Sequence, residues 1–381
     1  MKNDKEIEYL FVSNVEMRNV LGLFRMLNEH FGENKIHHLI LEREHIYRAS
    51  QPQVHEFQNI TFFPSHGGFL KQAKLVKSMY KRAKHIIILG FFLSMRMKLL
   101  LLSDKKAMEK TVWINMGSDL YLWQKFSNSF RDKFDNKVNF KFRNTVKYAG
   151  MPFPSDELFL KNNFSGIKKC FYTPMISSRL PLDKLDEIME GPVLKKDKPW
   201  IQVGHSIYQR GNHIYMLDMM EKFVKEDFRI ILPMSYGLGN EYADGGLHYR
   251  RAVINIAKQI YGKEKVTIMT KDIPLLNYLK YLSNIDILVT AVPQPQGLGN
   301  IWYLLYLGKK VFIPSGNPFY DFFINEGFEI YDTLKIPEMT YEEFIKPVTH
   351  IERKWINDRY DREKTIKYWE NFFDVLESES K

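Results

Sequence analysis

Short apolar runs alternate with segments of helical periodicity throughout the first half of the chain. Runs rich in branched and aromatic residues predict buried strands at 9–13, 35–41, 60–64, 85–91 and 110–115. Apolar residues recur at helical spacing over 14–31, 69–84 and 97–108. Strands separated by helices are typical of a parallel sheet with helical crossovers. The first half therefore predicts an α/β domain.

The same rhythm restarts in the second half. Strand-like runs lie at 200–204, 228–233, 266–269, 285–289 and 310–314. Helical spacing is found over 213–224, 249–261, 273–282 and 297–307, and again in the tail at 352–377. The pattern predicts a second parallel sheet of Rossmann type. The two halves share this rhythm without a sequence repeat.

Prolines mark the region between the halves. They stand at Pro152, Pro154, Pro174, Pro181, Pro192 and Pro199. Proline continues neither a helix nor a central strand, so such clusters favour connecting segments. A chain of 381 residues is also longer than one ordinary core. We expect a first domain at 1–175, a linker at 176–198, a second domain at 199–350 and a C-terminal helix at 351–381.

The composition fits a globular protein with an anionic partner. Hydrophobic residues make up 45% and charged residues 26% of the chain, and the formal net charge is +10. A positive excess favours nucleic acid, an anionic lipid surface or a phosphate-bearing substrate. The single cysteine, Cys170, excludes an internal disulfide. The charged start of the chain lacks the apolar core of a signal peptide, and no apolar run is long enough to span a bilayer. These features favour a cytoplasmic protein.

Three loops in the second half follow predicted strands and combine glycines with hydrogen-bonding side chains. The carboxyl ends of parallel strands form the ligand-binding edge of an open sheet, and helix N-termini there attract phosphate. The candidate binding residues are, loop by loop, Gly204, Ser206, Arg210, Asn212 and His213; Ser235 and Tyr236; and Gln294, Gln296, Gly297, Gly299 and Asn300. Alone, the first loop is equally explained as an ordinary turn with Asn212 as a helix cap. The second alone is better explained as a glycine-rich surface turn, and the alternative for the third is a loop punctuated by proline and glycine with Asn300 in the first turn of the helix. Three in order on one edge favour a phosphorylated ligand, most simply a nucleotide sugar.

Two residues of the first half are candidates for the chemistry. The strand at 110–115 runs into Gly117-Ser118-Asp119, so Asp119 is expected at the sheet edge. A carboxylate there can act as a base or bind a hydroxyl. His66 follows the strand at 60–64 in a histidine-glycine-glycine turn. The alternatives are an N-cap for Asp119 and an ordinary loop histidine for His66. No paired-aspartate metal motif is evident, so no metal is expected.

A basic stretch accompanies the helix predicted at 69–84. Its cationic residues alternate with apolar ones, and they are Lys71, Lys74, Lys77, Lys81 and Arg82. An amphipathic basic element can lie on anionic lipid, and we assign these five side chains to membrane contact. The alternative is a solvated outer helix packed on the sheet. Nucleic acid is disfavoured, because the motifs of common nucleic-acid modules are missing.

Several motifs keep the order found in one family of enzymes. They are the runs at 201–206, 212–213, 231–237, 296–300 and 308–312. His66-Gly67 and the segment from Trp113 to Tyr121 follow the same order in the first half. This arrangement resembles glycosyltransferase family 56, the TDP-4-acetamido-4,6-dideoxygalactose (Fuc4NAc):lipid II transferases of enterobacterial common antigen synthesis. The similarity covers most of the chain and is densest over 200–315.

Two departures from the family pattern are visible. Residues 238–247 stand where a short polar turn is expected, and His205 stands where a smaller polar residue is expected. Both lie in the loops that would hold the donor. They bear on which sugar is transferred more than on the class of reaction.

The resemblance implies a GT-B architecture. This is an α/β fold of two facing Rossmann-like domains, the second holding the nucleotide sugar, with the C-terminal helix packing back toward the first. Family members transfer a 4-acetamido-4,6-dideoxyhexose from a TDP-sugar to a polyprenyl-diphosphate-linked glycan, with retention at the anomeric carbon. They act as peripheral proteins at the cytoplasmic face of the membrane. The nucleotide sugar is then a substrate, and no cofactor is expected.

The same resemblance distributes the candidate residues between two sides. The residues of the three loops fall on the donor side, and Asp119 and His66 fall on the acceptor or catalytic side. Two alternatives come from other classes of protein. One is a nucleotide-sugar epimerase with a similar donor pocket, and the other is a non-catalytic binding module for envelope assembly.

Overall fold

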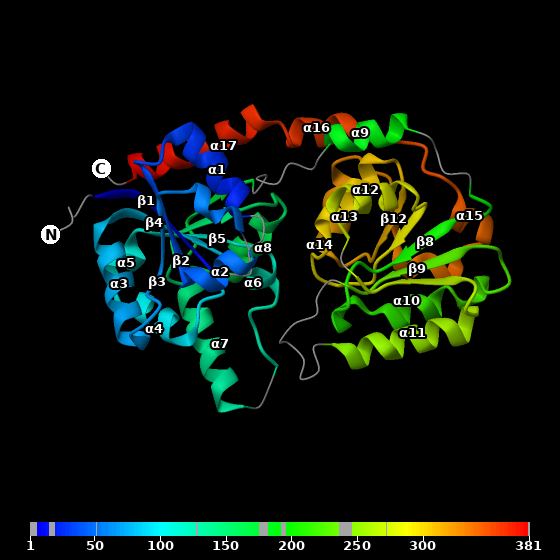
Figure 1. Cartoon of the computed structure of the whole chain (residues 1–381), viewed down its shortest axis with the longest axis horizontal. Helices are drawn as coiled ribbons and strands as arrows, with labels where there is room; N and C mark the ends of the chain where they lie inside the picture. The colour runs from blue at the N-terminus through cyan, green and yellow to red at the C-terminus, as the bar shows by residue number, and fades with distance from the viewer. Residues whose placement is uncertain are drawn as a thin grey trace. The chain divides into compact units, whose positions relative to one another are not determined.

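The chain divides into two compact units (Figure 1). The computed structural model describes residues 6–14, 20–50, 52–126, 129–174, 182–191, 196–235, 246–271 and 273–379. Unit 1 contains Met1–Arg179 and Tyr360–Lys381, and unit 2 contains Leu180–Arg359. The boundary falls inside the segment expected to be a linker, and that segment contributes helix α9 (Leu182–Glu190) to unit 2.

Unit 1 is built on a parallel sheet. Its described residues form seven strands in the order β3-β2-β1-β4-β5-β6-β7. These strands are β1 (Ile7–Ser13), β2 (Ile36–Arg43), β3 (Ile60–Phe63), β4 (Ala83–Leu89), β5 (Thr111–Ile114), β6 (Tyr148–Met151) and β7 (Lys169–Tyr172). The strand order runs outward from β1 in one direction and from β4 in the other. The order therefore reverses between β1 and β4, as in a Rossmann-like domain.

Helices cover both faces of this sheet. They are α1 (Val20–Phe31), α2 (Glu44–Ser50), α3 (Gly68–Arg82), α4 (Met95–Ser103), α5 (Lys105–Glu109), α6 (Ser118–Tyr121), α7 (Phe130–Arg143), α8 (Asp156–Asn163) and α17 (Arg362–Ser378), with a 3-10 turn at Pro52–Glu56. One hydrophobic cluster joins the sheet to α3, α4, α7 and α8. A second joins the other face to α1 and α17 (Figure 1).

The C-terminal helix is part of the core of unit 1. Trp369, Phe372, Phe373 and Leu376 of α17 are buried in the cluster that also contains Phe11 of β1. The sequence therefore predicted correctly that the tail packs back on the N-terminal domain. The single tail helix expected at 352–377 is two helices, because Asp361 caps a new start by accepting a hydrogen bond from Lys364 N at 2.8 Å.

Unit 2 repeats the architecture with a second parallel sheet. Its described residues form six strands in the order β10-β9-β8-β11-β12-β13. They are β8 (Trp200–Val203), β9 (Arg229–Pro233), β10 (Val266–Met269), β11 (Ile287–Val289), β12 (Lys310–Ile313) and β13 (Ile330–Asp332). Here the order reverses between β8 and β11. The two Rossmann-like sheets predicted from the sequence are confirmed.

The helices of unit 2 also lie on two faces (Figure 1). They are α9, α10 (His213–Met219), α11 (Leu247–Tyr261), α12 (Leu275–Ser283), α13 (Leu298–Tyr306), α14 (Pro318–Asn325), α15 (Tyr341–Ile345) and α16 (Arg353–Arg359), with 3-10 turns at Gln209–Gly211, Glu221–Phe223 and Thr333–Glu338. Helices α10 and α11 share a core with β8 and β9. Helices α12 and α13 pack together on the opposite face.

Candidate active site

The three glycine-bearing loops of unit 2 leave neighbouring strands at one sheet edge. The first follows β8, the second follows β9 and the third follows β11, and β8 lies between the other two in the sheet. The first and third loops thus flank the point where the strand order reverses. In open α/β sheets this crevice is where ligands bind. The structure therefore brings the first and third predicted loops to the expected place, and the second begins at the same edge after β9.

A direct hydrogen bond joins the first loop to the third. Asn212 adopts the left-handed conformation with φ 53°, which asparagine tolerates better than most residues. Its side-chain nitrogen donates to the carbonyl of Ala291, just beyond β11, at 3.1 Å. Asn212 was predicted to bind the ligand directly. Its placement shows that it fixes the two sides of the crevice relative to each other, and its contact with a ligand stays a prediction.

His213 is buried inside the first loop. Its ring packs against Gly204 and Gly211, and a Cβ atom on Gly211 would lie 2.6 Å from the ring. Gly204 has φ +69°, which strongly favours glycine. The two glycines therefore make room for the imidazole.

The hydrogen bonds of His213 favour one neutral tautomer. The hydroxyl of Tyr249 lies 3.1 Å from the backbone nitrogen and 3.2 Å from Nδ1 of His213. One hydroxyl can accept from the backbone and donate to Nδ1, which leaves the proton on Nε2. Burial, helped by His205 and only partly offset by the backbone of Ser206, lowers the pKa of His213 to about 3. The ring is therefore a neutral hydrogen-bonding group at physiological pH.

Two buried polar side-chain atoms in the first and third loops make no hydrogen bond. They are Ser206 Oγ and Gln296 Oε1, two of thirteen such atoms among the described residues. Buried polar groups are almost always paired with protein, water or ligand. Their presence in the two loops that border the crevice fits a site that is completed by a bound molecule.

The third loop packs against His205 of the first. Gly297 has φ +70°, and a Cβ atom there would lie 2.8 Å from Nδ1 of His205. Burial lowers the pKa of His205 to about 4, so this ring is also neutral. His205 departs from the family pattern, and the structure shows its place: it forms the contact between the first loop and the glycine that precedes α13.

Two adjacent tyrosines of α12 support Asn300 and the first loop. The Tyr278 hydroxyl donates to Asn300 Oδ1, and the ring of Tyr278 lies beside Tyr281. Tyr281 in turn donates to Gln202 Oε1 at 2.8 Å, and Gln202 Nε2 donates to the carbonyl of Gly204 at 2.9 Å. Helix α12 thus supports Asn300 directly and the carbonyl of Gly204 through Gln202.

Sequence reasoning missed two further residues at this edge. Asn317 is buried and donates to the carbonyls of Val292 and Gln294, at 2.7 and 3.0 Å. It fixes the third loop from a position remote in sequence. Arg250, in the first turns of α11, approaches the carbonyl of Met234 at 3.5 Å and is a second candidate cation beside the exposed Arg210.

The remaining donor-side predictions are placed as follows. Ser235 is half-buried directly after β9. Gln294 is half-buried, and Gly299 is exposed in the first turn of α13. Tyr236 and most of the second loop, 236–245, lie outside the described residues. Their assignment stays a prediction.

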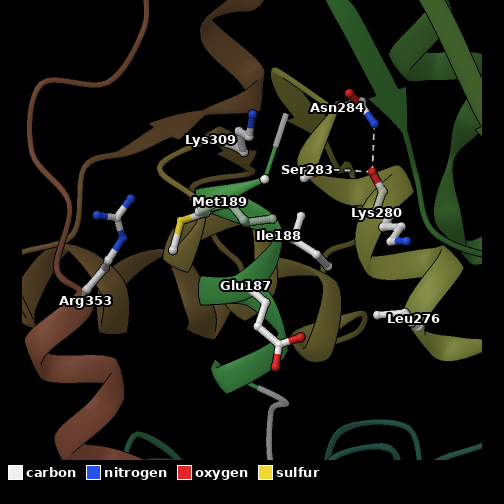
Figure 2. A pocket seen from close by; sticks show the side chains of 11 residues that line it. Glu187, Ile188, Met189, Leu276, Lys280, Ser283, Asn284, Lys309 and Arg353 are labelled. Carbon is white, nitrogen blue, oxygen red and sulfur yellow. Dashed lines mark hydrogen bonds between the residues drawn. The ribbon is translucent and has the colours of Figure 1, made fainter. Parts of the chain in front are cut away.

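The pocket drawn in Figure 2 is separate from this edge. Its volume is about 750 Å³, and it is lined by α9, by α12, by Lys309 and by Arg353. Asn284 and Lys309, which also line it, precede β11 and β12, so it opens at the amino ends of the strands. Phosphate-binding helix N-termini point toward the other edge, and this pocket is therefore not the nucleotide site.

In unit 1, Asp119 is deeply buried and fully engaged within the fold. It accepts hydrogen bonds from Phe91 N, Met116 N and Trp113 Nε1, each at 2.7 Å. Burial raises its pKa, although Arg143 and these hydrogen bonds oppose the shift. The sequence predicted a carboxylate projecting from the sheet edge. The structure shows instead one that ties the ends of β4 and β5 together, and its catalytic role stays a prediction.

The structure does not bring His66 and Asp119 together. His66 is exposed in the turn after β3, and Asp119 follows β5. Strands β2, β1 and β4 lie between them, which corresponds to about 19 Å at the usual strand spacing. The two residues therefore cannot act on the same atom within unit 1 as described.

A buried carboxyl that the sequence did not reveal lies beside Asp119. Asp156, at the start of α8, accepts a hydrogen bond from the Tyr121 hydroxyl at 2.7 Å. Burial raises the pKa of Asp156 to about 6, although hydrogen bonds from Tyr121 and Asn115 oppose the shift. The tyrosine and the aspartate are far apart in sequence, so no local motif indicates them. Because burial raises the pKa of Asp156, we expect the stability of unit 1 to depend on pH.

This carboxyl leads to a prediction about stability. Its folded-state pKa exceeds the unfolded value of about 3.9, so the native state binds the proton more tightly. Stability is therefore expected to fall as pH rises from about 4 to about 6. Relative to Asp156→Asn, the wild type should lose about 2–3 kcal/mol across that window, measured by denaturant unfolding. Tyr121→Phe should move this loss of stability to higher pH, because it removes a hydrogen-bond donor to the charged carboxylate. If the stability of the wild type changed with pH in parallel with that of Asp156→Asn, the prediction would be contradicted.

The basic helix of unit 1 is α3. Lys71, Lys74, Lys77 and Lys81 are exposed, and Arg82 is half-buried. Its apolar residues Val76, Met79 and Tyr80 are buried against the sheet. The apolar side needed for the predicted membrane contact is thus occupied by the core. No helix of the described residues is long and apolar enough to cross a bilayer.

Two Rossmann-like parallel sheets in one chain are typical of the GT-B class. HepE from Anabaena, in complex with UDP, aligns with a TM-score of 0.64 at 11% identity, covering 98% of this chain and 100% of that one. Sucrose-phosphate synthase from Thermosynechococcus elongatus aligns with a TM-score of 0.59 at 13% identity, covering 97% and 98%. The N-terminal domain of Candida albicans trehalose-6-phosphate phosphatase gives 0.61 at 14% identity, covering 98% and 99%. At these identities the similarity shows the fold alone, and the predicted GT-B fold is confirmed.

The family is shown by the sequence. The model of glycosyltransferase group 56, described as 4-alpha-L-fucosyltransferase, matches residues 14–357. The chain belongs to this family, and the resemblance drawn from its loops is confirmed. It is therefore a nucleotide-sugar glycosyltransferase. Among the described residues, no group of three or more His, Cys, Asp or Glu side chains is arranged to hold a metal ion.

Proposed function

We propose that this glycosyltransferase moves a 4-acetamido-4,6-dideoxyhexose of the Fuc4NAc type from a TDP-sugar to a polyprenyl-diphosphate-linked glycan. The acceptor would lie at the cytoplasmic face of a bacterial membrane, where the protein acts in synthesis of a cell-envelope polysaccharide. The transfer retains the configuration at the anomeric carbon and needs no metal. The family match over 14–357 is the observation that carries this proposal.

The donor edge of unit 2 supports this chemistry. As the bond to the leaving diphosphate breaks, negative charge develops that must be stabilised. The start of α13 after Gly297 presents free backbone amides to such a charge, and Arg210 or Arg250 can add a cation. His205 and His213 are neutral, so they serve as shape and hydrogen-bonding groups. Without a metal, these groups must carry the stabilisation.

A nucleotide panel separates this function from its alternatives. Purified protein is heated with TDP, UDP, GDP or CMP, and unfolding is followed. A ligand at about one hundred times its Kd stabilises the folded state by about 2.7 kcal/mol, which raises the Tm by roughly 5–10 °C for a domain of this size. We expect TDP to give the largest shift. A non-catalytic module predicts no shift with any nucleotide, and an epimerase predicts turnover of the nucleotide sugar without an acceptor.

Ser206→Ala tests the donor edge with little disturbance of the fold. The Ser206 hydroxyl is buried without a hydrogen bond, so its removal should leave the Tm of the free protein unchanged. If it binds a diphosphate oxygen, a charge-assisted bond is lost and the nucleotide Kd should rise about tenfold or more. Calorimetric titration with TDP measures this change. If the affinity for TDP were unchanged, Ser206 would not contact the nucleotide.

A further inference from the structure

Helix α7 presents large apolar side chains on the side that faces away from the core of unit 1. Its inward residues are Asp135, Val138, Asn139, Phe142 and Arg143, all buried. On the outward side, Phe130 is 84%, Phe140 is 53% and Phe134 is 41% exposed. Phe126, just before the helix, is 94% exposed. We call Phe126, Phe130, Phe134 and Phe140, with the exposed basic residues of α7, the α7 face.

The basic residues of the α7 face are interleaved with its aromatic rings. They are Arg131, Lys133, Lys137 and Lys141, and all four are exposed. The acids of α7 are Asp132 and Asp135, and Lys125 pairs with both. Asp135 is moreover buried on the inward side. The α7 face therefore carries positive charge with its acids neutralised.

Specific contacts hold this face in place. Lys98 of α4 and Asp135 form a buried ion pair at 2.8 Å, which locks α7 to its neighbour. Asn136 donates to the carbonyl of Lys125 at 2.8 Å and accepts from its backbone nitrogen at 2.9 Å. These two bonds fix the backbone beside Phe126. The exposed rings are thus presented by an anchored element.

Helix α3 gives the contrast within the same unit. It carries five cationic residues and no acidic one, but its buried apolar side chains Val76, Met79 and Tyr80 face the sheet. Leu70 is its only large hydrophobic residue that is mainly exposed, at 82%. Both helices lie on the same face of the sheet (Figure 1). Charge is therefore present on both, whereas charge combined with exposed aromatic rings belongs to α7.

We propose that the α7 face is the surface that docks this enzyme on an anionic lipid bilayer. Lysine and arginine side chains attract acidic headgroups, while aromatic rings between them enter the interface. A row of rings and cations along a helix matches an extended anionic surface. The proposal rests on the proposed function, since a lipid-linked acceptor requires the enzyme to meet the membrane. It replaces α3, assigned from the sequence, with α7.

Vesicle flotation with three matched variants of the full chain tests the α7 face. Phe130→Ser with Phe134→Ser removes aromatic rings and keeps the charge. Lys133→Gln with Lys137→Gln and Lys141→Gln removes charge and keeps the rings. Lys74→Gln with Lys77→Gln and Lys81→Gln makes the same charge change on α3. Each protein is mixed with phosphatidylcholine vesicles, with or without phosphatidylglycerol.

We expect the wild type and the α3 variant to float equally with the anionic vesicles. Both α7 variants should lose affinity by roughly tenfold or more, as expected for several interfacial contacts. The wild type should be released as salt rises, because headgroup attraction is screened. The phenylalanine variant should bind weakly even at low salt.

The outcome is read together with the nucleotide panel for each variant. The rise in Tm on addition of TDP reports on unit 2, and it should be the same in all the variants. If only the α3 variant loses binding, or if both α7 variants float like the wild type, the assignment to α7 is wrong. If the wild type binds TDP but no vesicle, the docking proposal fails while the transferase proposal stands. Single-stranded RNA that binds in place of lipid would also overturn it.

Discussion

Asp119→Ala is expected to lower the free energy of unfolding of unit 1 by about 3–6 kcal/mol. The substitution leaves Phe91 N, Met116 N and Trp113 Nε1 without their acceptor. Each buried donor left unpaired costs about 1–3 kcal/mol, against a total stability of about 5–15 kcal/mol. Denaturant unfolding measures the loss. Asp119→Asn keeps one acceptor oxygen and should lose about half as much.

The same variants decide between two roles for Asp119. Asp132→Ala, which removes a partly exposed acid paired at 3.4 Å with Lys125, is a matched control and should cost less than about 1 kcal/mol. TDP should still raise the Tm of unit 2 in Asp119→Asn. If Asp119→Asn and Asp119→Ala keep wild-type stability but lose sugar transfer, Asp119 is the base that its position in the sequence suggested, and the structural role is wrong.

Gly297→Ala is expected to disrupt the donor edge. A side chain at φ +70° is strained by about 1–2 kcal/mol, and its Cβ would also press on His205 at 2.8 Å. Relief of that contact shifts the first loop, the third loop or both. Because a small misplacement of reacting groups is costly, we expect transfer to fall about a hundredfold or more. Initial rates with the sugar donor, and the Tm of the free protein, measure both effects.

Gly299→Ala is the matched partner of that substitution. Gly299 lies two positions further, in the first turn of α13. Its backbone is not left-handed, and a Cβ there would meet no atom within 4 Å. The free protein should therefore keep its Tm. If a phosphate approaches this backbone, nucleotide affinity falls without loss of stability. Equal activity in Gly297→Ala and wild type would show that this loop does not hold the donor.

The sequence predicted the sheets well where strands are fully buried. β1, β4, β8, β9 and β12 are dense apolar runs, and each was found at the expected place. β6 and β7 were missed, because Tyr148-Ala-Gly-Met151 and Lys169-Cys-Phe-Tyr172 are short and mixed. The helix expected at 97–108 is two helices, since Asp104 accepts from Ala107 N and starts a second one.

In the candidate site, too, some features were visible in the sequence and others were not. Loops that follow strands are visible in sequence, so the candidate donor-side residues could be chosen from it, and their contact with a ligand stays a prediction. Their partners were not visible: Asn317, Arg250 and Tyr249 come from elements remote in sequence. The burial of Asp119 and the exposure of the rings on α7 also depend on tertiary packing. In α7, aromatic and basic residues alternate, so the periodicity of the sequence does not show which side of the helix faces the core.

The central claim is that this chain transfers a sugar from a nucleotide to a lipid-linked acceptor. The most direct measurement incubates the purified protein with TDP-4-acetamido-4,6-dideoxygalactose and a polyprenyl-diphosphate disaccharide in vesicles, followed by NMR of the product linkage. We predict one added sugar in α linkage, with TDP released in equal amount and no requirement for added metal. Turnover of the donor without an acceptor, or no transfer from a donor whose nucleotide binds, would contradict the account.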